Sequence, residues 1–401
     1  MFFQIMTALC IGILLGIFTG LTPGIHTNLL AVMLVSASPL LLQYTSVMAL
    51  AVFIIAVSVT NTFVDSIPSI FLGAPDSDMA LGVLPGHRYL LKGWGYQAVK
   101  LTLIGSFGAV ILSILMFPFS IPIVKLVYPI VKDYIGWMLI IVVVFMILRD
   151  NKKLWALFVF LIAGSLGLVV LNMPTLEQPL FPMLSGLFGI STLLISLRDT
   201  NSIPEQKTED RIKLKKGHMV KALLSGQFSG FITAILPGLG AAQAAIISMQ
   251  ITRKLGDHGF LILIGSINTV NFILSISALY AIDKARNGSI VAISELMPEG
   301  ITLSIAVLFL AATIVSGAAS VYFTLKIARV FSRLMNMIDY RKLVIGIIIF
   351  IIILAVIMTG PLGLLVLIVS TAVGVIPAEV KVTRTHGMAC LILPVILYFV
   401  L

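Results

Sequence analysis

The chain is built from apolar runs long enough to cross a lipid bilayer, and these runs recur from one end to the other. A hydrocarbon core about 30 Å thick takes about 20 apolar residues as helix. In lipid such a run must satisfy its own backbone polar groups, which favours helix over open sheet. We therefore expect an all-α integral membrane protein with about ten transmembrane helices. The runs lie at 47–72, 94–118, 134–149, 154–171, 180–197, 259–282, 301–325, 341–358, 362–378 and 386–401.

The composition excludes a soluble domain and a nucleic-acid-binding protein. Only 10% of the 401 residues are charged, against roughly 25% in soluble proteins. The net charge of +10 comes from basic residues in short loops between apolar runs, as expected of cytoplasmic loops. Cys10 and Cys390 both lie in apolar segments, so neither a disulfide framework nor a cysteine metal site is indicated. We expect no nucleic-acid partner, no metal and no bound cofactor.

Loop charges predict the orientation in a cell membrane. Arg149, Lys152 and Lys153 form one basic cluster, residues 207–221 hold another, and Lys381 and Arg384 follow near the end. Such clusters favour the cytoplasmic side. The loop 172–180 has no Lys or Arg and is predicted to lie outside. Counting spans from these loops places the N- and C-termini both on the extracytoplasmic side.

A short motif occurs twice and divides the chain. The stretch Gly16–Gly24 (GIFTGLTPG) recurs as Gly230–Gly238 (GFITAILPG), with a shared pattern G-x-x-T-x-x-x-P-G. We expect a first membrane repeat over 1–204, with a hairpin at 4–38 and spans to 197. A solvated cytoplasmic linker over 205–217 then leads to a second repeat over 218–401, with its hairpin at 222–251.

Each Pro-Gly pair is predicted to form the tip of a re-entrant hairpin. The apolar run before Pro237 is about 15 residues, or about 22 Å as helix, which is short of the membrane core. Loop charges place the ends of the two hairpins on opposite faces, which gives the inverted-repeat arrangement of many secondary transporters. The alternative is that Pro23 and Pro237 only kink ordinary transmembrane helices.

The hairpin tips and the middles of the following spans carry the candidate site. A helix that starts just after a Pro-Gly tip points its free N–H groups and positive dipole end at the cavity, which suits an anion. Carbonyls at the ends of the first arms suit a coupling Na⁺ or H⁺. Asp65 is costly inside a span and therefore a functional candidate, although Asn and Thr at such positions also satisfy neighbouring helices. The predicted substrate-binding residues are Thr22, Pro23, Gly24, Ile25, His26, Thr27, Asn28, Asn61, Thr62, Asp65, Ser66, Pro237, Gly238, Leu239, Gly240, Gln243, Asn268, Thr269 and Asn271.

A polar loop after the first long span is a candidate gate. It contains Asp76, Asp78, His87, Arg88 and Lys92. One interpretation is a gate or an anion-attracting mouth, and the other is ordinary cytoplasmic basic charge.

Several stretches resemble one transporter family. They are Gly20–Asn28 (GLTPGIHTN), Pro68–Asp76 (PSIFLGAPD), Leu84–Gly93 (LPGHRYLLKG), Leu184–Gly189 (LSGLFG), Leu236–Gly240 (LPGLG) and Gly387–Pro394 (GMACLILP). On these residues the chain resembles the large membrane subunit of tripartite tricarboxylate transporters, in a shorter archaeal-type form. The resemblance implies a carboxylate permease that works with a small membrane subunit and an extracytoplasmic binding protein. The acidic loop 73–78 departs from the neutral small-residue run of the family, so tricarboxylate as the substrate does not follow.

Other functions stay open beside this one. The nearest rival is transport of a polyprenyl phosphate lipid carrier, because Pro-Gly hairpins would also suit a phosphate head group. An intramembrane enzyme is disfavoured, since no H-E-x-x-H motif occurs and Asp65 lacks a second carboxylate on a facing span. A channel is disfavoured by the repeat with interrupted helices. The partners expected are therefore a small anion or a lipid phosphate, membrane lipids and the two subunits, with a homodimer left open.

Overall fold

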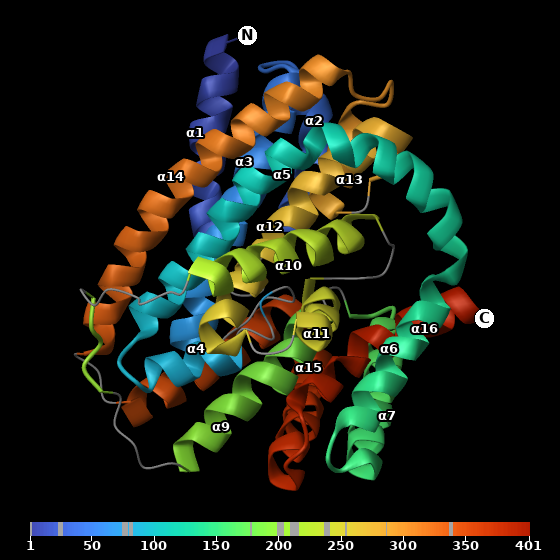
Figure 1. Ribbon diagram of the computed structural model, residues 1–401. Coiled ribbons are helices and arrows are strands. Elements are labelled where there is room, and N and C mark those ends of the chain that lie inside the picture. The colour runs from blue at the N-terminus through green and yellow to red at the C-terminus, as the bar shows by residue number, and fades with distance from the viewer. Residues whose placement is uncertain are drawn as a thin grey trace.

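The computed structural model describes residues 2–22, 27–73, 79, 83–176, 179–198, 204–208, 216–235, 241–252, 255–285, 287–336 and 340–401. Within these ranges the chain forms helices and connecting loops and no β-strand (Figure 1). The expected all-α architecture is therefore confirmed.

The two halves present their helices in the same order. In the first half these are α1 (Phe2–Leu21), α2 (Thr27–Leu41), α3 (Val47–Val64), the π-helix η1 (Pro68–Leu72), α4 (Val83–Leu90), α5 (Gly95–Val131), η3 (Lys132–Tyr134), α6 (Ile135–Arg149), α7 (Lys153–Leu171) and the continuous run α8 (Leu180–Leu184), η4 (Ser185–Ile190) and α9 (Ser191–Arg198). The second half holds α10 (Lys216–Ile235), α11 (Ala241–Thr252), α12 (Gly256–Ile282), α13 (Gly288–Leu296), α14 (Leu303–Met335), α15 (Tyr340–Val380), η5 (Arg384–Met388) and α16 (Ala389–Val400). Each half thus has two helices around its Pro-Gly motif, a long helix, a short helix, a second long helix and closing helices.

Seven of the described helices are long and apolar enough to cross a membrane. They are α1, the run α3–η1, α5, α7, α12, α14 and α15, while α6, the run α8–α9 and the run η5–α16 are apolar but shorter. A multi-pass membrane protein is confirmed by these helices. The number of crossings and the re-entrant hairpins stay predictions, since α1 with its 20 residues is long enough to span by itself.

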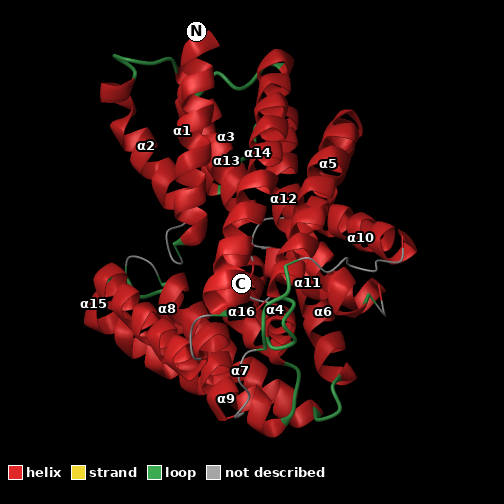
Figure 2. Ribbon diagram, turned by 90° about the vertical axis from the view of Figure 1, so that its left-hand side faces the viewer, coloured by secondary structure: helices red, strands yellow, loops and turns green. Residues whose placement is uncertain are grey.

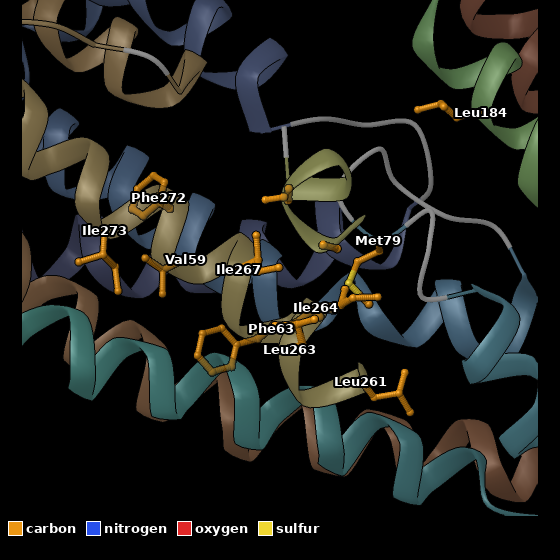
Figure 3. Close-up of a cluster of buried hydrophobic side chains, with 14 of the residues drawn as sticks. Val59, Phe63, Met79, Leu184, Leu261, Leu263, Ile264, Ile267, Phe272 and Ile273 are labelled. Carbon is orange, nitrogen blue, oxygen red and sulfur yellow. The ribbon is translucent and has the colours of Figure 1, made fainter. Parts of the chain in front are cut away.

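Two helices, α3 and α12, form the centre of the molecule. Their apolar windows are 78% and 89% buried, against 44% or less for the other candidate spans. Helix α1 packs on α3 and α10 packs on α12, while α5 and α14 pack on the central helix of the opposite half. Apolar side chains such as Val59 and Phe63 of α3 join Ile267 and Phe272 of α12 in one core (Figure 3).

Glycines let the long helices approach closely. A Cβ added at Gly105 of α5 would overlap the carbonyl oxygen of Ile262, and one at Gly265 of α12 would overlap that of Thr102. Because small residues allow backbones into contact, membrane helices use them at interfaces. These two glycines fix α5 and α12 side by side in antiparallel register.

The closing helices of both halves form a second bundle. Helix α16 packs on α6 and α7, and α15 packs on the run α8–α9. Figure 2 shows α7, α9 and α15 below the group that contains α1, α2 and α14. Outward-facing side chains here are apolar, for example Ile141 at 68% and Leu154 at 83% exposure, which is the surface that lipid tails cover.

Helix α15 contains a sharp break. Gly360 has φ 64° and ψ −164°, a conformation that essentially only glycine adopts. The two spans predicted at 341–358 and 362–378 lie on either side of this residue. The two predicted spans therefore correspond to two helices that meet at the kink at Gly360.

The linker predicted as solvated is anchored where the structure describes it, over 204–208. Gln206 is 4% exposed. Its side chain donates to Leu90 O (2.8 Å) and Pro204 O (2.9 Å) and accepts from Gly95 N (3.0 Å), while its backbone N–H donates to Asn336 Oδ1 (2.7 Å). This part of the linker thus joins the turn between α4 and α5 to the end of α14.

Candidate functional site

The repeated motif corresponds to a repeated helix contact. A Cβ at Gly16 would lie 2.6 Å from Thr60 Cβ, and a Cβ at Gly230 would lie 2.5 Å from Val270 Cβ. The threonine of each motif donates from Oγ1 to the glycine carbonyl three residues before it, Thr19 over 3.2 Å and Thr233 over 2.8 Å. The motif residues therefore position α1 on α3 and α10 on α12 in the same way.

Both motifs continue into segments outside the described residues. Pro23, Gly24, Ile25 and His26 of the first tip, and Pro237, Gly238, Leu239 and Gly240 of the second, lie there. Thr22 directly follows α1 and donates to Phe18 O over 2.9 Å, and α2 begins at Thr27. Asn28 in α2 and Gln243 in α11 belong to described helices, but their side chains do not belong to the described part.

The C-terminal end of α3 and the middle of α12 bring predicted site residues from both halves together. Asn268 Nδ2 donates to Asp65 Oδ2 over 3.2 Å, and Thr62 Oγ1 lies 3.5 Å from Thr269 Oγ1. Asp65, Asn268 and Thr269 are 4%, 5% and 1% exposed, and Thr62 is half-buried. We call these four residues the crossing cluster.

A further polar contact extends the crossing cluster toward the first motif. Asn61 Nδ2 donates to Thr19 Oγ1 over 3.2 Å. Ser66 is buried but donates to Phe63 O of its own helix, and Asn271 is half-buried in α12. Thr19 belongs to the repeated motif but was not among the predicted site residues. The recurrence of this threonine as Thr233 could have indicated that it has a role.

The backbone changes its helical form at Asp65. Helix α3 ends there, and the π-helix η1 starts at Pro68. Pro68 has no N–H to donate to the Val64 carbonyl, and Ser69 Oγ donates to Asp65 O over 2.8 Å. Such π-helical turns are frequent at functional sites.

The candidate gate loop is only partly within the described residues. Asp76 and Asp78 lie outside them. The prediction of a loop is wrong for His87 and Arg88, which lie in the last turn of α4. His87 is buried, and burial lowers its pKa to about 4, so its ring is neutral at pH 7. Arg88 and Lys92 are exposed, and Arg88 Nη1 lies 3.8 Å from Asp257 Oδ1 at the start of α12. Exposed positive charge in this loop therefore comes from Arg88 and Lys92 rather than His87.

A buried acid–histidine pair was not predicted. Asp150 Oδ2 lies 3.1 Å from His386 Nε2 and accepts from Thr383 N (3.0 Å) and Thr383 Oγ1 (2.9 Å), while Oδ1 accepts from Lys152 N (3.1 Å). Burial alone raises the pKa of Asp150, but these hydrogen bonds bring it to about 2. The contacts of Asp150 with Thr383 and His386 tie the α6–α7 loop to the α15–η5 loop and to η5, two parts of the chain that are predicted to lie on the same membrane face.

Comparison with known proteins identifies the family of this chain. The model of the tripartite tricarboxylate transporter TctA family matches residues 6–389. The chain belongs to this family. An uncharacterized protein of Methanocaldococcus jannaschii is 28% identical to this TctA-family chain over 400 residues, which cover 98% of each protein. No solved structure matches the chain significantly.

The family confirms the resemblance seen in the sequence. Its members are membrane components of tripartite tricarboxylate transporters, so the transport class and the multi-pass membrane location of this TctA-family chain follow. It is a family of transporters and not of enzymes. The substrate is not fixed by membership.

Proposed function

We propose that this chain is the large membrane subunit of a transporter that imports an organic di- or tricarboxylate by alternating access. The observation that carries the proposal is the crossing cluster, in which polar side chains from the two halves meet between the two most buried helices. Polar and ionisable side chains inside membrane spans are costly, and they often mark substrate or ion pathways.

The helix ends beside the tips support an anionic substrate. Helices α2 and α11 begin at Thr27 and Ala241, a few residues after their Pro-Gly pairs. The N-terminal end of a helix presents free N–H groups and partial positive charge, so two such ends suit the carboxylates of one substrate. We propose that the tips 22–28 and 237–243 bind the substrate as re-entrant hairpins of opposite orientation.

The proposal includes partners and an ion. Because the family is tripartite, we propose that a small membrane subunit and an extracytoplasmic binding protein deliver the substrate. A cation gradient would drive uptake, which is the usual energy source of transporters with interrupted helices.

Uptake in cells tests the proposal. Cells that lack their own carboxylate uptake would express the chain with its two partner subunits, and accumulation of labelled citrate or succinate would be measured. We expect accumulation with the wild-type chain and none with Gly24→Val or Gly238→Val at equal membrane levels, because a branched side chain blocks approach to the backbone. Wild-type uptake by both variants would rule out binding at the tips, and no uptake of any carboxylate by the wild type would rule out the function.

A further inference from the structure

The crossing cluster gathers oxygen atoms from both halves of the molecule. Thr62 and Asp65 are three residues apart on α3 and so lie on one helix face, while Asn268 and Thr269 are adjacent on α12. The contacts between Thr62 and Thr269 and between Asn268 and Asp65 join the two pairs. Two hydroxyl oxygens and a carboxylate therefore lie within one buried cluster.

The hydroxyl hydrogens in this cluster have partners elsewhere. Thr62 Oγ1 donates to Val59 O over 2.8 Å, and Thr269 Oγ1 donates to Gly265 O over 3.2 Å. A hydroxyl has one hydrogen and two lone pairs, so these bonds leave lone pairs for the 3.5 Å contact between the two oxygens. The lone pairs of the two threonine hydroxyls face each other beside the Asp65 carboxylate, and this arrangement favours a bound cation.

One backbone carbonyl next to Asp65 lacks its helical donor. The backbone stays helical from α3 through Asp65 into η1, but the Val64 carbonyl has no N–H to accept from Pro68. A backbone carbonyl without its helical donor is an oxygen ligand of the kind that Na⁺ takes. The backbone next to Asp65 therefore offers an oxygen ligand for a cation, as the side chains of the crossing cluster do.

A buried amide side chain on α5 lies at the same height along the helices as the crossing cluster. Gln97 of α5 is 4% exposed, and neither amide atom has a hydrogen-bond partner among the residues that the structure describes. Gly105 of α5 lies beside Ile262 of α12, and Thr102 lies beside Gly265. If this antiparallel register continues along α5, Gln97 lies level with residues 269–270 of α12. A buried polar group of this kind calls for a ligand or water.

We propose that a sodium ion binds at the crossing of α3 and α12, with the Asp65 carboxylate and the Thr62 and Thr269 hydroxyls among its ligands. Hard cations take oxygen ligands of this type. The Asn268 amide donates to Asp65 Oδ2 and holds the carboxylate in place, so Asn268 is a positioning residue.

The ligands explain how the ion couples to transport, a role that rests on the proposed function. Two ligands come from α3 and one from α12, so the ion binds tightly only when the two halves have this arrangement. A ligand that prefers one arrangement shifts the population toward it. Sodium binding therefore favours the arrangement described here over one in which α3 and α12 separate.

The test measures sodium binding without transport. The thermal unfolding midpoint of the purified protein in detergent is followed as NaCl replaces choline chloride at constant ionic strength. The wild-type midpoint should rise and saturate with Na⁺ by mass action. Asp65→Asn should abolish the rise, and Thr62→Val and Thr269→Val should each raise the Na⁺ concentration for half of it. Asn268→Ala should raise it about 10- to 100-fold, as for other residues that orient a ligand.

A matched control and the Thr variants keep the test decisive. Thr371 also donates to a carbonyl of its own helix, Leu367 O over 2.7 Å, but lies in α15, so Thr371→Val should keep the wild-type Na⁺ response. If Asp65→Asn does not fold, the two Thr→Val variants decide.

An unchanged Na⁺ response in the Asp65 and Thr variants would overturn the site, and so would an Asp65-dependent response to pH with none to Na⁺. A Na⁺ response that depends on these residues, in a protein that takes up no carboxylate, would leave the site standing and remove the proposed function.

Discussion

At the scale of single residues, burial decides which charged or titratable side chains act as charges. His87, Arg88 and Lys92 look alike in the sequence as a basic loop, yet His87 is buried and the other two are exposed. Burial disfavours the charged imidazole and lowers the pKa of His87 to about 4. The packing of α4 decides which of these three side chains is buried. No local sequence pattern indicates that packing.

The lowered pKa predicts how stability changes with pH. A histidine whose pKa is about 4 when folded and about 6.5 when unfolded stabilises the fold fully above pH 6.5. That contribution, about 3 kcal/mol, is lost as the pH falls from 6.5 to 4. His87→Gln should therefore flatten the fall in the thermal unfolding midpoint over this range.

The control for this prediction is the exposed His218 at the start of α10. His218→Gln should keep the wild-type pH profile. If His87→Gln also keeps it, the buried ring does not account for the acid sensitivity.

Residue types in the candidate site could be recognised from the sequence, but their contacts could not. Asp65, Asn268, Thr62 and Thr269 were all predicted because polar residues are costly in a span. That Asn268 donates to Asp65 depends on two helices about 200 residues apart crossing at that point. The tip residues, including His26, lie outside the described part of the chain and stay predictions.

At the scale of helices, the apolar runs predicted most positions closely. The run 47–72 corresponds to α3 with η1, and 154–171 corresponds to α7. The run 94–118 was too short, since α5 continues to Val131 through Pro118, Pro122 and Pro129. Figure 1 shows this end of α5 curving toward α6. Proline is tolerated in membrane helices, where neighbours satisfy the freed carbonyls, so it did not end the helix.

The contact between α5 and α12 gives a prediction at this scale. Gly105→Ala should destabilise the protein by about 1–3 kcal/mol or more, because the added methyl overlaps the Ile262 carbonyl and forces two central helices apart. The thermal unfolding midpoint in detergent measures the loss. Gly317→Ala in α14 is the matched control, since its Cβ would meet no atom closer than 3.5 Å. Equal midpoints for the two variants would contradict the described packing.

The linker gives a second prediction. Gln206→Ala removes a side chain that bonds Leu90 O and Gly95 N, and leaving such buried groups unpaired costs about 1–3 kcal/mol. Limited proteolysis should then cut within 204–216 faster than in the wild type. Glu205→Ala, at an exposed neighbouring position, should not accelerate the cut, and equal rates in all three proteins would show that the linker is not anchored. A single polar residue in a charged segment gave no sequence signal for this contact.

At the scale of the whole molecule, two similar halves share one centre. Each half places a motif helix on its own long helix, and its second long helix on the long helix of the other half. The structure thereby joins α3 and α12 at the crossing cluster, where a substrate or an ion would have contact with both halves. The two inverted membrane repeats expected from the motif G-x-x-T-x-x-x-P-G stay a prediction, and the packing of α5 on α12 and of α14 on α3 had no signature in the chain.

The most direct test of the account is binding of a carboxylate anion. The purified protein in detergent would be heated with citrate, succinate, phosphate or a short polyprenyl phosphate, each with and without Na⁺. A ligand that binds the native state at 100 times its Kd stabilises it by about 2.7 kcal/mol. We predict that a soluble carboxylate raises the unfolding midpoint and that Na⁺ increases the effect. Stabilisation by polyprenyl phosphate alone would contradict it and assign the site to a lipid carrier.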